Sequence, residues 1–91
     1  MDPQIVYPID MDDYAWWEVE QKGWIEVTVR WASAERVVTF YDPTRLLQSV
    51  DVDLKRRSYF AGRIVVVPAV TRSALESAVT AMARLDFIEM R

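Results

Sequence analysis

The chain has 91 residues, 52% of them hydrophobic, and a formal net charge of −3, which fits one folded domain and excludes an intrinsically disordered chain. It contains no cysteine and no histidine, which excludes disulfides, thiolate chemistry, the commonest general base and the commonest transition-metal ligand. No apolar stretch approaches the roughly 18 residues that span a bilayer, and the first residues do not resemble a signal peptide. We therefore expect a soluble cytoplasmic protein that is not an enzyme and has no cofactor, no metal site and no membrane contact.

The first 13 residues predict an extended N-terminal arm. This segment contains Pro3, Pro8 and an acidic cluster at 10–13. Residues 14–91 then form a single α+β domain. The apolar residues of the arm are able to lie along this domain or to pair with it as an edge strand: Ile5, Val6, Tyr7 and Ile9.

Residues 15–41 predict a three-stranded antiparallel meander. From Trp24 to Trp31, apolar residues alternate with others, as in a strand that has one buried face. A three-residue loop at 21–23 places Val19 opposite Ile25. This register keeps the carboxylates of Glu18 and Glu20 out of the core.

A four-residue loop at 32–35 sets the register of the second hairpin. It pairs Val29 with Val38 and Val27 with Phe40, all on the inner face. The meander then has an apolar inner face and a mixed outer face.

Residues 10–23 also allow a different interpretation. Asp10 can serve as the N-cap of a helix, with Gly23 following its C-terminus. Acids in the first turn favour this helix, but the apolar residues between the two ends do not form one clean stripe. We prefer the strand because it satisfies the register of the hairpin.

A helix is expected over residues 43–56. Asp42 suits the N-cap and Pro43 the first helical position. Residues 50–54 also alternate as a strand would, so that alternative stays open. Four apolar residues recur at helical spacing: Leu46, Leu47, Val50 and Leu54.

Residues 59–67 predict the central strand of the sheet. Four β-branched residues run from 64 to 67, and Pro68 ends them. A continuous apolar run is typical of a strand covered on both faces, so Val65 and Val66 are both expected to be buried.

A second helix is expected to begin after Thr71 and to end near Arg84. Thr71 suits the N-cap, and Val70 and Leu75 are spaced as a hydrophobic staple. One apolar stripe follows helical spacing: Leu75, Ala78, Val79, Met82 and Leu85.

These elements predict an α+β fold, a two-layer sandwich with the order β-β-β-α-β-α. A right-handed crossover through helix 43–56 makes strands 36–41 and 59–67 parallel. The sheet is therefore mixed and four-stranded, with both helices on one face.

The outer sheet face is the candidate interaction surface. Two helices cover only one face, which leaves large aromatic residues exposed unless a partner or the 1–13 arm lies over them. We therefore expect a small non-catalytic protein-interaction module, an adaptor, inhibitor or immunity-type binder, that forms a homodimer through this face. The predicted interface residues are Trp16, Glu18, Trp24, Glu26, Thr28, Arg30 and Tyr41.

Three glutamates also come close together on this face in the predicted register: Glu18, Glu20 and Glu26. Clustered carboxylates can bind a cation. Exposed carboxylates in water, beside Arg30 or Lys22, are the simpler interpretation, and we predict no metal site.

Residues 45–72 carry most of the positive charge and support an alternative function, a small-ligand or single-stranded nucleic-acid binder. The chain is acidic overall and contains no nucleic-acid-binding motif, so nucleic acid ranks below a protein partner. The candidate ligand-binding residues are Arg45, Arg56, Arg57, Arg63 and Arg72.

Overall fold

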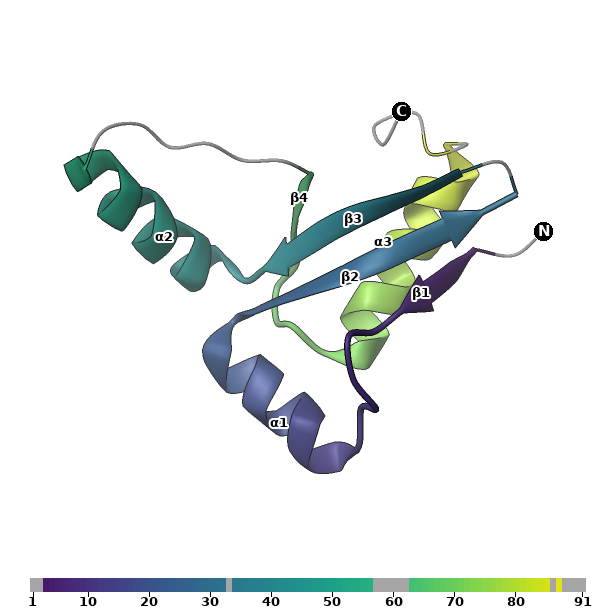
Figure 1. Ribbon diagram of the computed structural model, residues 1–91, viewed down its shortest axis with the longest axis horizontal. Helices are drawn as coiled ribbons and strands as arrows, with labels where there is room; N and C mark the ends of the chain where they lie inside the picture. Colours follow the sequence, from purple (N-terminus) through teal and green to yellow (C-terminus); the bar gives the residue numbers. More distant parts are fainter. Residues whose placement is uncertain (1–2, 33, 57–62, 86, 88–91) are drawn as a thin grey trace.

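The computed structural model describes residues 3–32, 34–56, 63–85 and 87, without the side chains of residues 53, 54 and 56. It confirms the α+β class and the mixed four-stranded sheet. The predicted order β-β-β-α-β-α is retained, with one helix added after the first strand (Figure 1). The elements are β1 (Gln4–Val6), α1 (Asp13–Lys22), β2 (Trp24–Trp31), β3 (Ala34–Tyr41), α2 (Pro43–Arg56), β4 (Ile64–Val66) and α3 (Arg72–Arg84).

The first strand comes from the N-terminal arm. Ile5 of β1 pairs with Val29 of β2 in an antiparallel ladder. The expectation that the arm can pair as an edge strand is therefore confirmed.

The added helix, α1, replaces the strand predicted over residues 15–20. The Asp12 carboxylate accepts a hydrogen bond from the Ala15 N–H at 2.8 Å and caps the helix at its N-terminus. Gly23 ends it in the left-handed conformation, with φ of 81°, and donates its N–H to the Val19 carbonyl at 2.9 Å. The meander over residues 15–41 was therefore wrong, and the helix interpretation was right with Asp12 in place of Asp10 as the N-cap. Caps at both ends outweigh the alternating pattern between them.

The hairpin of β2 and β3 has the predicted faces but a different register. Val27 pairs with Val38, and Ile25 pairs with Phe40. The connection comprises residues 32–33, so each partner is displaced by two positions from the prediction. The same side chains stay inside because the side-chain period of a strand is two.

β4 lies parallel to β3, as predicted, but at the edge of the sheet, where the order is β1-β2-β3-β4. The prediction of a central strand with both valines buried was wrong, because Val66 is 48% exposed. A short apolar run does not distinguish a doubly covered strand from an edge strand that has one open face. Residues 59–62 of the predicted strand lie outside the described residues.

α2 has the predicted bounds, so a strand over residues 50–54 is excluded. None of its described side chains is buried, and none packs against the core cluster. Figure 1 shows the helix extending away from the sheet beyond the end of β3. The two helices that cover the inner face are therefore α3 and, through Trp16 and Val19, α1, in place of the predicted pair.

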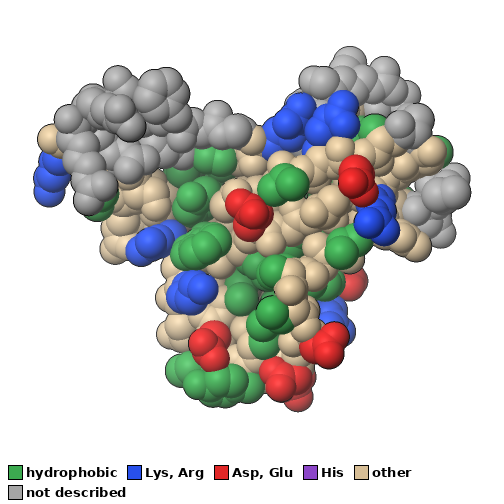
Figure 2. Space-filling view, in the orientation of Figure 1, with side chains coloured by type: hydrophobic (Ala, Val, Ile, Leu, Met, Phe, Trp, Pro, Cys, Tyr) green, Lys and Arg blue, Asp and Glu red, His purple; other side chains and the backbone are tan. Residues whose placement is uncertain are grey.

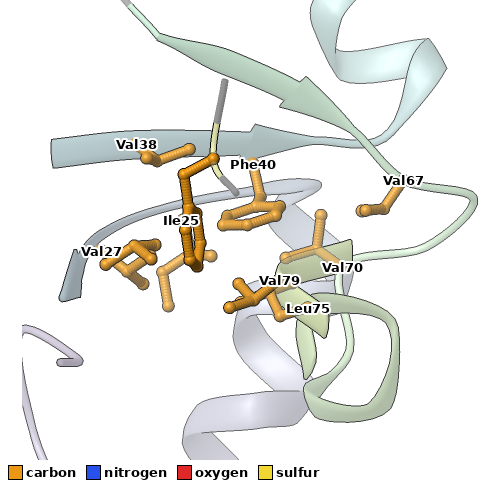
Figure 3. Close-up of a cluster of buried hydrophobic side chains, with 10 residues drawn as sticks. Ile25, Val27, Val38, Phe40, Val67, Val70, Leu75 and Val79 are labelled. Carbon is orange, nitrogen blue, oxygen red and sulfur yellow. The ribbon is translucent and has the colours of Figure 1, made fainter. Parts of the chain in front are cut away.

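α3 supplies the helical side of the core (Figure 3). The Thr71 hydroxyl caps it by accepting from the Ala74 N–H at 3.3 Å, and Val70 and Leu75 are both fully buried, as predicted. The apolar stripe predicted for this helix does not extend to Leu85, which is 60% exposed. The chain turns after α3, and the core comprises Ile25, Val27, Val29, Val38, Phe40, Val67, Val70, Leu75, Val79 and Phe87.

Candidate interaction surface

The outer face of the sheet consists of the side chains that point away from α3. Strand pairing places Val6, Thr28 and Val37 in one row across β1, β2 and β3. Val6 is 39% exposed and Val37 is 54% exposed. Neighbouring side chains in such a row interact directly across the strands, so the row forms a continuous partly apolar surface.

A second row crosses the other end of the same face. Trp24 pairs with Tyr41, and Tyr41 pairs with Val66 of β4. The Lys22 ammonium, at the end of α1, lies 4.7 Å from the centre of the Trp24 ring. This end of the face therefore combines two aromatic rings, a half-exposed valine and a positive charge.

Arg30 of β2 and Glu35 of β3 form an ion pair on this face. The Arg30 Nε lies 2.7 Å from the Glu35 Oε2, and the two side chains are 55% and 58% exposed. An exposed pair of this kind adds at most about 1 kcal/mol to the stability of a chain. Its groups stay available for contacts with a partner at the rim of an interface.

No described helix lies over this face. Figure 1 shows α3 behind the sheet, and Figure 2 shows apolar side chains interspersed with charged ones across the front. Contiguous exposed apolar surface on a small domain commonly marks an interaction site. The outer face is the strongest candidate site in the described part of the chain.

Five of the seven predicted interface residues lie on this outer face: Trp24, Glu26, Thr28, Arg30 and Tyr41. The other two, Trp16 and Glu18, belong to α1 because the predicted strand there is a helix. Sequence reasoning missed Val6, Val37, Ile64 and Val66. The alternation of β3 could have identified Val37, whereas the assumption of a doubly covered strand concealed Ile64 and Val66.

Trp16 has partners within its own chain. Its ring meets the Tyr7 ring edge to face with centres 5.2 Å apart, and the Arg72 guanidinium lies 5.4 Å from its centre. The alternative in which the arm covers the tryptophans therefore applies to Trp16, whereas Trp24 lies on the open face. Burial and the charge of Glu76 raise the pKa of Tyr7, while Arg72 acts in the opposite direction.

The three glutamates expected to cluster are divided between α1 and β2. Glu18 and Glu20 lie on the helix, and Glu26 lies on the strand. Within the described ranges, no group of three or more acidic side chains could hold a metal ion.

The candidate ligand-binding arginines are distributed over separate elements. Arg45 lies in the first turn of α2, Arg63 precedes β4, and Arg72 begins α3. Arg72 contacts the Met11 carbonyl at 3.5 Å and the Trp16 ring. Arg57 and the side chain of Arg56 lie outside the described residues, so a binding site formed by this set stays a prediction.

A surface hollow of about 440 Å³ lies between α1 and the start of α3. The Trp16 Nε1 is buried and has no hydrogen-bond partner among the residues that the structure describes. The hollow is lined by Asp13, Trp16, Trp17, Glu20, Thr71, Arg72 and Ser73. The hollow contains two acidic side chains, Asp13 and Glu20, and one basic side chain, Arg72. Charges of both signs do not define one class of ligand.

Comparison with protein-family models, curated proteins and solved structures finds no match to this chain. None of the helices in the described part of the chain is long and apolar enough to cross a membrane.

Proposed function

We propose that this protein is a small non-catalytic protein-interaction module that self-associates through the outer face of its sheet. The observation that carries the proposal is a sheet with only one face covered by described helices. Three valines on the open face are between 39% and 54% exposed: Val6, Val37 and Val66. A role as an adaptor, inhibitor or immunity-type binder in the cytoplasm would use the same surface.

Burial of these side chains supplies a driving force for association. Removing a half-exposed valine from water is worth on the order of 1 kcal/mol. Trp24 and Tyr41 add the residue types that carry most of the binding energy in protein interfaces. The apolar rows therefore form the expected centre of the interface.

The charges on the face suit a second copy of the same chain. Glu26 and Arg30 both lie on β2 and are both exposed. In a two-fold contact, a charge of one copy that meets an opposite charge of the other copy forms the same pair twice. This arrangement places the charged groups around the apolar rows.

Sedimentation velocity over a range of protein concentrations tests this function. We expect a dimer for the wild type and a monomer for Val37→Glu, because this substitution places an unpaired charge at the centre of the interface. Val37 is 54% exposed, so the fold should tolerate the change.

Leu85→Glu is the matched control, since Leu85 is 60% exposed and follows α3. It should leave the dimer intact. A wild type that sediments as a monomer at every concentration would contradict the proposal, as would a Val37→Glu variant that dimerises like the wild type.

A further inference from the structure

α2 is a second apolar surface that has no partner within the described chain. Leu47 is 64% exposed, and Leu46 and Val50 are only partly buried. These three residues lie on one side of the helix, because each residue advances about 100° around the axis. A helix with one apolar side normally buries that side against another element.

The start of α2 is fixed by hydrogen bonds at Asp42, the single residue between β3 and α2. The Asp42 N–H donates to the Gly23 carbonyl at 2.9 Å, and its carboxylate accepts from the Arg45 N–H at 2.7 Å. The Asp42 carbonyl accepts from the Leu46 N–H at 3.1 Å. These bonds hold the direction in which α2 leaves the sheet, so the helix does not reach the outer face of its own chain.

The helix and the outer face match in size. The 14 residues of α2 extend for about 21 Å. The 8 residues of β2 and of β3 extend for about 26 Å each. One helix can therefore lie along the two central strands and cover the valine and aromatic rows.

The charges at the border of the helix also match the face. Asp51 follows Leu47 by one helical turn and is exposed. The outer face carries the bases Lys22 and Arg30 near opposite ends of β2. An acid beside the apolar side of the helix can therefore meet a base at either end of the strand.

We propose that α2 of each copy lies across the outer face of the other copy, in a reciprocal two-fold exchange. This inference rests on the proposed self-association and names the element that occupies the face. Each copy then gives one helix and receives one, so both unpartnered surfaces are covered by the same contact.

Cross-linking of single-cysteine variants tests the exchange, because the natural chain contains no cysteine. Leu47→Cys and Val37→Cys are prepared with tags of different mass, mixed, and treated with a short bis-maleimide. We expect the mixed product to exceed either like-with-like product by at least tenfold.

Val52→Cys is the matched control for Leu47→Cys. Val52 is 51% exposed and lies about 140° around α2 from Leu47, on the opposite side from the apolar stripe. It should cross-link to Val37→Cys far less than Leu47→Cys does. Equal yields from the two helix positions would overturn the exchange.

Sedimentation of the uncross-linked protein separates the two proposals. A wild-type dimer in which only Val37→Cys cross-links to itself overturns the exchange and supports direct contact between two sheets. A wild-type monomer contradicts both proposals. A chain that carries both cysteines and forms mainly an intramolecular product also overturns the exchange, because α2 then covers its own sheet.

Discussion

Gly23 connects α1, β2 and the start of α2 through its backbone. Its φ of 81° lies in the left-handed region, and its carbonyl accepts from the Asp42 N–H. An added Cβ would lie 2.6 Å from the Asp42 Oδ2 and 2.8 Å from the Arg45 Cβ. Both the turn and the close approach therefore require the absence of a side chain.

Gly23→Ala should lower the free energy of unfolding by more than about 1 kcal/mol, since the left-handed conformation alone costs this much for alanine. The crowded contact with Asp42 and Arg45 adds to that cost. Urea denaturation followed by tryptophan fluorescence measures the change. Gly23→Asn is a useful comparison, because asparagine tolerates the conformation but carries the same Cβ. A Gly23→Ala variant as stable as the wild type would show that the contact of Gly23 with Asp42 and Arg45 can accommodate a side chain.

At the scale of elements, α2 and α3 have similar N-caps but different surroundings. Asp42 caps α2, whose described side chains are not buried, whereas Thr71 caps α3, which carries the buried Leu75 and Val79. Loss of a cap costs typically about 1 kcal/mol of helix stability. Loss of the Thr71 cap should therefore appear in global unfolding, and loss of the Asp42 cap in local opening of α2.

Thr71→Ala should lower the free energy of global unfolding by about 1 kcal/mol. Asp42→Ala should speed hydrogen exchange within α2 and change global unfolding much less, because α2 opens without exposing the core. Both substitutions are introduced into the Val37→Glu variant, which is expected to be monomeric, and are measured there. Equal loss of global stability from the two variants would mean that α2 is part of the cooperative core.

Local capping signals explain which elements could be predicted from the sequence. The start of α2 was predicted correctly from Asp42 and Pro43, and the start of α3 from the Thr71 hydroxyl. α1 was considered but not preferred, because Ala15, Trp17 and Val19 alternate as a strand would, although Trp17 is 57% exposed on the helix. The side on which a helix packs and the position of β4 in the sheet depend on tertiary contacts, which local patterns do not specify.

The part of the candidate surface that was predictable is the part in which buried and exposed residues alternate along a correctly predicted strand. The outward residues of β2 were identified correctly because Ile25, Val27 and Val29 are all buried on the opposite side. The contribution of β4 was missed because Val66 was assigned to the interior. Nothing in the spacing of α2 indicated that its apolar side would have no partner among the described residues.

On the scale of the whole molecule, the chain is more extended than a compact domain of its length. The radius of gyration over Cα atoms is 13.6 Å, and the principal extents are 42, 31 and 21 Å. A compact domain of this length has a radius of gyration of about 12 Å. The excess is consistent with a helix that projects from the body.

Small-angle scattering on the monomeric Val37→Glu variant should show this extended shape. We expect a radius of gyration clearly above the value of about 12 Å for a compact chain. Leu85→Glu at a concentration where it is dimeric gives the comparison for the assembled protein. A compact profile for the monomer would show that α2 folds over its own sheet when the partner is absent.

The two edge strands of the sheet, β1 and β4, are both short. β1 and β4 have 3 residues each, and Pro3 directly precedes β1 while Pro68 lies two residues beyond β4. Short strands flanked by proline offer an incoming strand few backbone groups to pair with, so β1 and β4 themselves are poor templates for a further strand. We therefore expect the proposed association through the sheet face to end at a pair of copies.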